Sequence, residues 1–216
     1  MRQLRDQELP LAGAGTPEDP ERVLLIACGA LAREILALNK QCGWDHLDLT
    51  CLPANLHNHP ELITQAVEDA VEKHRDAYKS IFVVYADCGT GGQLKRACDR
   101  MGVEMISGPH CYSFFEGEET FAAHEEEIDA FYLTDFLARQ FDAFVWEPMG
   151  LDRHPDLAGM YFANYSKLVY LAQTEDATLT EKAQDCARRL GLRFERRYTG
   201  YGDLETALGS LAQGVS

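Results

Sequence analysis

The stretch VVYADCGTGG, from Val83 to Gly92, has the pattern of a buried strand that runs into a glycine turn. A cysteine, Cys88, stands where the chain leaves this strand. The earlier stretch VLLIACGALAREI places Cys28 and Gly29 at the same kind of exit. In an open parallel sheet, the carboxyl ends of the strands lie on one edge, and ligands bind there. We therefore expect thiols from distant parts of the chain to gather at one sheet edge.

Strand patterns and helix patterns alternate along the chain. Short apolar runs predict strands at residues 23–27, 47–52, 81–86, 103–106, 168–172 and 192–197. Helical spacing predicts helices at 31–39, 60–78, 93–101, 125–146 and 180–190, with a last helix after TGYG. This alternation predicts a three-layer α/β fold whose mainly parallel sheet has about five to six strands and helices on both faces. We expect a loose arm over residues 1–20 and a single α/β domain over residues 21–216.

The composition and net charge of the chain argue against nucleic acids and membranes as binding partners. The chain has 216 residues, of which 46% are hydrophobic and 25% charged, as in ordinary globular proteins. Its net charge of -15 would be repelled by nucleic acid and by anionic membranes. No apolar run approaches the ~20 residues that span a bilayer, and the first residues lack the apolar core of a secretory signal. The sequence predicts a cytoplasmic protein without nucleic-acid or membrane partners, and a homodimer is the default assembly.

Three of the seven cysteines are candidate metal ligands. None forms a C-x-x-C pair, and in a reducing compartment they are free thiols or ligands. Thiolates of Cys28, Cys88 and Cys111 would repel one another unless a cation neutralised them. Zinc accepts cysteine and histidine and leaves one position open at catalytic sites, so we predict a transition metal, zinc favoured, held by these cysteines and His110. An iron–sulfur cluster with one open iron is an alternative, and a thiol nucleophile or plain packing is another.

The other cysteines and several polar residues have plainer interpretations. The remaining four cysteines are predicted to be small, buried hydrophobic side chains without a chemical role. They are Cys42, Cys51, Cys98 and Cys186. Asp87 and Glu147 are candidate catalytic proton carriers, although Asp87 could instead cap the next helix. The substrate-binding candidates near strand ends are His57, Asn58, Gly89, Thr90 and Tyr201. The segment DCGTGG fits neither common nucleotide-binding motif, and no G-x-S-x-G motif of a serine hydrolase occurs.

Several strings of the sequence together resemble one family. They are LLIACGALAREI, LPANLHNHPELI, VVYADCGTGG, GPHCYSFFEG, FYLTDFLARQFD, GLDRHPDL and YLAQTEDATL. The resemblance is to bacterial and archaeal proteins catalogued as a domain of unknown function, and it runs from Val23 to Leu208. Genes of that family often neighbour corrinoid-dependent methyltransferases that act on methylated amines. The resemblance implies a site at the Cys-Gly strings of Cys28 and Cys88 and at the string from His110 to Tyr112.

These observations lead to three functional hypotheses. The first is a metal-binding enzyme of one-carbon or methylated-amine metabolism, whose metal acts on a small substrate as a Lewis acid or thiolate activator. The second is an iron–sulfur enzyme with three cysteine ligands. The third is a non-catalytic accessory protein that binds a corrinoid protein or a methyltransferase.

Overall fold

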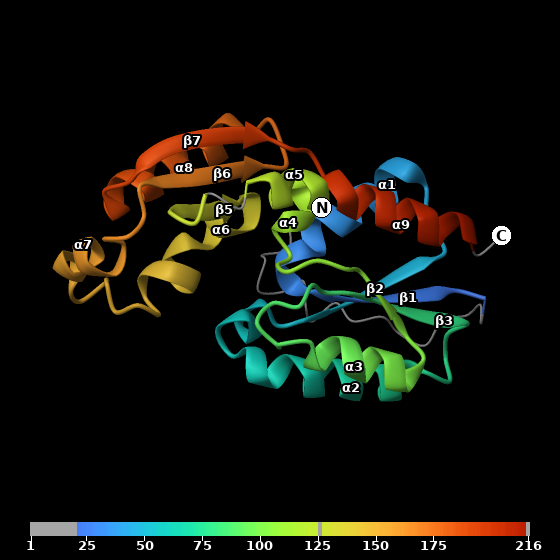
Figure 1. Cartoon of the computed structure of the whole chain (residues 1–216). Helices are drawn as coiled ribbons and strands as arrows, with labels where there is room; N and C mark the ends of the chain where they lie inside the picture. The colour runs from blue at the N-terminus through green and yellow to red at the C-terminus, as the bar shows by residue number, and fades with distance from the viewer. Residues whose placement is uncertain (1–20, 125–126, 215–216) are drawn as a thin grey trace. The chain divides into compact units, whose positions relative to one another are not determined.

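The computed structural model describes residues 21–124 and 127–214 of the chain (Figure 1). The predicted arm at residues 1–20 lies outside the described residues. The strands are β1 (Val23–Cys28), β2 (Leu47–Leu52), β3 (Ser80–Val84), β4 (Glu104–Met105), β5 (Ala130–Thr134), β6 (Lys167–Ala172) and β7 (Arg193–Tyr198). The α-helices are α1 (Ala32–Cys42), α2 (Ile63–His74), α3 (Gln93–Met101), α4 (Ser113–Glu116), α5 (Glu118–Ala123), α6 (Asp135–Phe141), α7 (Ala158–Tyr161), α8 (Ala177–Leu190) and α9 (Gly202–Gly214).

The strands form two parallel sheets. The first has the order β2-β1-β3-β4 and the second the order β5-β6-β7, and every strand pair is parallel. The predicted α/β class with parallel pairing and covering helices is confirmed, and the strands are distributed over two sheets. The chain divides into two compact units, one of residues 1–111 with 205–216 and one of residues 112–204. The prediction of a single domain over 21–216 stays a prediction.

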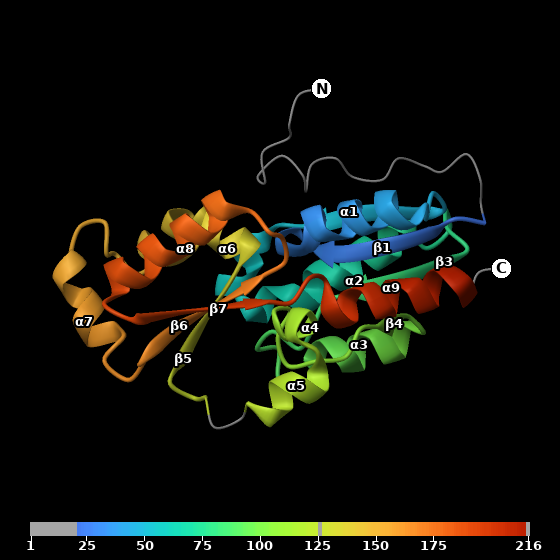
Figure 2. The same cartoon turned by 90° about the horizontal axis from the view of Figure 1, so that it is seen from above.

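In the first unit, helices cover both faces of the sheet. Strand β1 is buried at all six positions, which explains its unbroken apolar run. Figure 1 shows α2 and α3 on one face, with α1 and α9 on the opposite face, and Figure 2 gives the view from above. This layering leaves the carboxyl ends of β1, β2 and β3 on one edge, where the cysteine-bearing segments leave the sheet.

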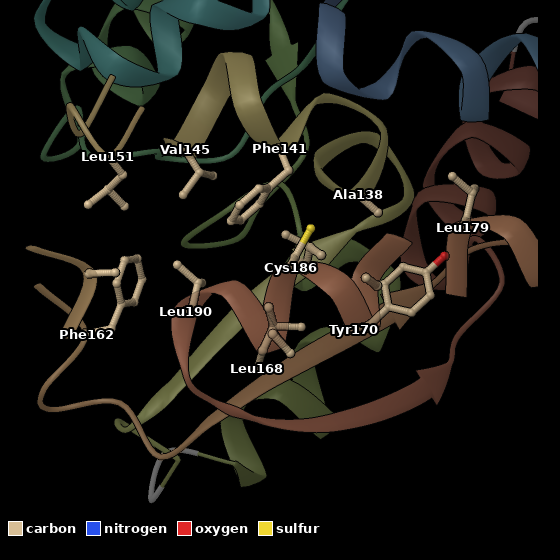
Figure 3. Close-up of a cluster of buried hydrophobic side chains, with 14 of the residues drawn as sticks. Ala138, Phe141, Val145, Leu151, Phe162, Leu168, Tyr170, Leu179, Cys186 and Leu190 are labelled. Carbon is tan, nitrogen blue, oxygen red and sulfur yellow. The ribbon is translucent and has the colours of Figure 1, made fainter. Parts of the chain in front are cut away.

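In the second unit, the two faces of the sheet carry separate apolar clusters. The larger cluster joins β6 to α6 and α8 and includes Leu168, Tyr170, Phe141 and Cys186 (Figure 3). The smaller cluster consists of Ala130, Val169 and Leu171, with Tyr112 and Tyr132 packed against it. Since Val169 and Tyr170 belong to different clusters, β6 alternates between two buried faces, as a central strand should.

The long helix predicted at residues 125–146 is wrong over its first half. Residues 125–126 are outside the described part, and β5 occupies the positions from Ala130 to Thr134. Helix α6 begins only after Thr134, whose Oγ1 accepts a hydrogen bond from Leu137 N at 3.4 Å. A π-helical turn, η5 (Asp142–Trp146), continues it. A short apolar run such as Ala130 to Thr134 is compatible with either a strand or a helix. Here it forms a strand because it pairs with β6.

Helix α8 ends at Leu190 as predicted, but it begins at Ala177, three residues before the predicted start at Thr180. Helix α8 has 14 residues, and its cap Asp176 accepts hydrogen bonds from Thr178 N and Leu179 N. Its C-cap is Gly191, which has the left-handed conformation that glycine adopts without strain. Across the described residues, no helix is both long enough and apolar enough to pass through a membrane.

Candidate functional site

Two predicted site cysteines meet beside the first sheet. The loop after β4 is tied to the exit of β3 by two backbone bonds, from Asp87 N to Gly108 O at 2.9 Å and from Cys88 N to Pro109 O at 3.0 Å. These bonds fix the loop that ends in Cys111. As a result, the Sγ atoms of Cys88 and Cys111 lie 3.2 Å apart, within hydrogen-bonding distance for thiols.

The backbone at Cys88 is unusual. Among the described residues, Cys88 is the only non-glycine residue with a positive φ, which is 46°. Such a conformation is strained for a residue with a Cβ and persists only where surrounding contacts impose it. The bond from Cys88 N to Pro109 O is one such contact. The same residue carries the sulfur that lies 3.2 Å from the sulfur of Cys111.

Asp87 supports this turn. Its carboxylate accepts hydrogen bonds from Thr90 Oγ1 at 2.9 Å, Gly91 N at 3.2 Å and Gly92 N at 2.6 Å. The bond from Gly92 is the largest cause of a lowered pKa at Asp87, with help from Thr90. Both carboxylate oxygens are therefore engaged in holding the loop that precedes α3, and the catalytic role predicted for Asp87 stays a prediction.

The two thiols of the pair have opposite acidity. The hydrogen bond from Cys111 lowers the pKa of Cys88 to about 5, against the opposing effect of burial, and a hydrogen bond with His57 lowers it further. The same bond to Cys88, together with burial, raises the pKa of Cys111 well above 9.0. The hydrogen bond to Cys88 also raises the pKa of His57. The negative charge therefore rests on Cys88, while Cys111 keeps its proton.

Cys28 lies close enough to affect both members of the pair. Burial raises the pKa of Cys28 to about 11, and the charge of Cys88 contributes to this rise. Cys28 in turn helps to raise the pKa of Cys111. The nearby Tyr85 side chain acts on the pKa of Cys28 in the opposite direction. Cys51, at the end of the neighbouring strand β2, is also buried, and its pKa is raised to about 12 by burial and by Cys28.

The structure does not complete a metal-ligand set. In residues 21–124 and 127–214, no group of three or more histidine, cysteine, aspartate or glutamate side chains is arranged to hold a metal ion. Two of the predicted ligands, Cys88 and Cys111, are brought into contact, and Cys28 influences both electrostatically. His110 is half-buried in the loop before Cys111. The metal prediction stays a prediction.

The remaining predicted site residues have varied positions. His57 and its neighbour Asn58 are exposed residues of a 3-10 turn after β2. Of the two, His57 interacts with Cys88. Gly89 is exposed with φ 85°, and Thr90 is buried behind the turn. Glu147 and Tyr201 belong to the second unit, where Glu147 is exposed and Tyr201 half-buried.

The prediction for the four other cysteines is correct for three. Cys51, Cys98 and Cys186 are buried. Cys42 is exposed because it falls in the last turn of α1, next to Gly43, on the side that faces solvent. The prediction of a buried Cys42 is therefore wrong.

A second polar cluster, which the sequence analysis missed, lies at the carboxyl ends of β5 and β6. Asp135 is 0% exposed, and its Oδ1 accepts from Tyr170 Oη at 2.6 Å and from Gln173 N at 3.1 Å. Its Oδ2 accepts from Thr174 Oγ1 at 2.6 Å, and its own N donates to Gln173 Oε1 at 2.8 Å. The sequence does contain a signal for this cluster, which is the pair Thr134 and Asp135 directly after the apolar run. The signal is visible only if that run is predicted to be a strand.

Comparison with known proteins gives a family but no characterised relative. A family model described as "Protein of unknown function (DUF1638)" matches residues 51–208. Neither the curated proteins nor the solved structures contain a match to the chain. The matched segment includes His57, Cys88 and Cys111, and Cys28 lies before it.

Proposed function

The chain belongs to the DUF1638 family, and we propose that it is a thiol-dependent protein in which Cys88 is the reactive thiolate and Cys111 its partner. The observation that carries this proposal is the 3.2 Å contact between the two Sγ atoms. Geometry and acidity agree, because the short contact stabilises the charge on one sulfur and holds the proton on the other. A thiolate, rather than a thiol, is the nucleophile in cysteine chemistry.

Burial limits the reaction partner. Cys88 is 5% exposed, so a small molecule can reach its sulfur more readily than a protein surface can. His57 is exposed and interacts with Cys88, so an imidazole adjoins the thiolate. Its raised pKa favours the protonated form, which can stabilise the thiolate and supply a proton to a leaving group. The substrate class that fits is a small disulfide.

The proposed step is thiol–disulfide exchange. The Cys88 thiolate attacks one sulfur of the small disulfide, a bond forms between Cys88 Sγ and that sulfur, and the first substrate thiolate leaves. Cys111 gives its proton to this thiolate and attacks Cys88 Sγ, which expels the second substrate thiolate. His57 protonates this second thiolate. The protein is left with a Cys88–Cys111 disulfide, and two electrons have passed to the substrate. A small dithiol reverses the sequence.

Alkylation kinetics test the assignment of the thiolate. In full-length protein purified without oxygen, iodoacetamide should label Cys88 preferentially at pH 6, with a rate that follows a midpoint near pH 5. Cys111→Ala should shift this midpoint upward because it removes the main hydrogen-bond donor to the Cys88 sulfur. The exposed Cys42 provides an internal comparison, read by peptide mass spectrometry. Faster labelling of Cys42 than of Cys88 at pH 6 would contradict the proposal.

A specific observation favours a second candidate, a soft-metal protein. Cys28 adds a third sulfur whose charge state is linked to both Cys88 and Cys111. In this proposal these three cysteines, with His110, hold zinc or an iron–sulfur cluster in a protein of one-carbon or methylated-amine metabolism, either as an enzyme or as an accessory to a corrinoid methyltransferase system. The metal would supply Lewis acidity or thiolate activation at the sheet edge.

Elemental analysis separates the two candidates. Stoichiometric zinc or iron in anaerobically purified protein, lost in the Cys28→Ser, Cys88→Ser and Cys111→Ser variants, would support the metal protein. Cys186→Ser is the matched control, because Cys186 is buried in the second unit. Metal-free protein that keeps the acidic Cys88 would support the thiol proposal. Co-purification with a corrinoid protein, without turnover of a small disulfide, would favour the accessory role.

A further inference from the structure

The segment that joins β2 to α2 in the first unit is anchored weakly. This strap, residues 53–62, contains the 3-10 turns η3 (Ala54–Asn58) and η4 (Pro60–Leu62). The structure describes all of its residues, and each is exposed or half-buried, whereas Ile63 directly after it is 1% exposed. Three backbone hydrogen bonds of 2.9–3.1 Å have both partners inside the strap. A segment that is bonded to itself and has no buried side chain can move at a small cost in free energy.

Two residues of the strap adjoin the turn that carries the proposed thiolate. A Cβ placed on Gly89 would lie 3.4 Å from Cβ and 3.5 Å from Cγ of Pro60, so the proline ring closes the space beside this glycine. His57, three positions before Pro60, interacts with Cys88. The strap therefore meets two consecutive residues of the turn, Cys88 and Gly89.

These contacts leave little room around the Cys88 sulfur. Cys88 is 5% exposed, although the strap beside it lies at the surface. The Sγ atom of Cys111 occupies part of the surrounding space at 3.2 Å, and His57 adjoins the same thiolate. In thiol–disulfide exchange the attacked sulfur must come into bonding contact with the thiolate. A narrow disulfide can do so with less displacement of the strap than a broad one.

We propose that the strap is a size filter, that the small disulfide has unbranched aliphatic substituents, and that Pro60 sets the limit. This inference rests on the proposed exchange reaction at Cys88. Pro60 suits the role because it stands at the first position of η4, where its ring fixes φ, and because the same ring contacts Gly89. A disulfide with aromatic substituents requires the strap to move and to lose these contacts, so it reacts more slowly.

Disulfides of different width test the filter on the full-length chain, reduced and kept free of oxygen. Hydroxyethyl disulfide is narrow and dithiodipyridine is aromatic, and both are uncharged at pH 7. The loss of each free thiol is followed by quenched alkylation and peptide mass spectrometry, and the rate at Cys88 is divided by the rate at the exposed Cys42. We expect this relative rate to be at least about tenfold lower for dithiodipyridine, because strap displacement raises the barrier. Equal relative rates for the two disulfides would overturn the proposal.

A variant of the strap tests the role of Pro60. Pro60→Gly removes both ring atoms that contact Gly89 and frees φ, so the relative rate of dithiodipyridine should rise at least about fivefold. Pro155→Gly is the matched control, because Pro155 also follows a histidine and starts a 3-10 turn, η6 (Pro155–Leu157), in the second unit. No change in Pro60→Gly, or an equal change in Pro155→Gly, would overturn the assignment.

The comparison in the wild-type chain needs no variant, so it remains decisive if Pro60→Gly fails to fold. Iodoacetamide separates this inference from the proposed function. An acidic Cys88 that reacts with both disulfides at equal relative rates would overturn the filter and leave the thiolate assignment in place. Slower iodoacetamide labelling of Cys88 than of Cys42 at pH 6 would overturn the thiolate assignment itself.

Discussion

The two sheets each place a buried anion past the carboxyl end of a strand, but they satisfy it differently. In the first unit, the Cys88 thiolate is stabilised chiefly by the Cys111 thiol and His57. In the second unit, the Asp135 carboxylate accepts bonds from Tyr170, Gln173 and Thr174 and has no exposed surface. A buried anion with a full set of donors is a structural element. A buried anion with few donors and an adjacent imidazole can still act as a nucleophile.

The largest expected effect comes from removing the well-satisfied anion. Asp135→Ala leaves three donors, from Tyr170, Gln173 and Thr174, without their acceptor in a buried site. We expect a loss of about 3–5 kcal/mol in the free energy of unfolding, measured with urea. Asp176→Ala, which removes only the exposed cap of α8, should cost about 1 kcal/mol. Equal effects of the two substitutions would show that the Asp135 cluster is not structural.

The acidic thiol predicts a pH-dependent contribution to stability. Because the folded pKa of Cys88, about 5, lies below the unfolded value of 9.0, its contribution is complete above pH 9 and is lost as pH falls to 5. Between pH 5 and 6.5, wild-type protein should gain stability over Cys88→Ala by up to about 1 kcal/mol per pH unit. The raised pKa of His57 acts in the opposite direction only above its ordinary value of 6.5.

Urea unfolding of both proteins at several pH values measures this difference. Subtraction of the Cys88→Ala curve removes the titration of carboxylates that both proteins share. A difference that is independent of pH between 5 and 6.5 would mean that Cys88 has an ordinary pKa, and the contrast between the two sheets would then fail.

The support of the thiolate can be weakened without touching sulfur. Asp87→Ala removes the acceptor for Thr90 Oγ1, Gly91 N and Gly92 N in the turn beside Cys88. We expect a loss of about 1–2 kcal/mol in stability and an upward shift of the Cys88 alkylation midpoint, because the turn no longer holds the sulfur against Cys111. Asp45→Ala, at an exposed loop position, is the control. An unchanged midpoint would indicate that the turn does not position Cys88.

The smallest effect should come from one donor of the carboxylate cluster. Thr174→Val removes the bond to Asp135 Oδ2 but leaves both bonds to Oδ1. We expect a loss of about 1 kcal/mol and no change in Cys88 alkylation. Urea unfolding and alkylation on the same samples measure both quantities. A loss as large as that of Asp135→Ala would show that one hydroxyl dominates the cluster.

Local sequence patterns predicted most strands but failed where two patterns overlap. The run at Val23 and the strand–cysteine exits were predictable because a buried parallel strand is continuously apolar. The apolar residues from Phe131 to Leu133 fit either a helix face or a strand, and the interpretation as a helix is why Asp135 was not recognised as a residue at a strand end. Arg197 and Glu116 are 81 positions apart, so no local pattern could have paired them.

By itself, the sequence determined that cysteines would leave strands at the carboxyl edge of a parallel sheet, because apolar runs, glycine turns and strand direction are local properties. Only the tertiary structure decided which groups meet there. The order β2-β1-β3-β4 and the bonds that tie the exit of β3 to the loop after β4 bring Cys88 to Cys111 and His57. Strand order and loop docking depend on contacts between residues far apart in the chain, and these contacts set which sulfur carries the charge.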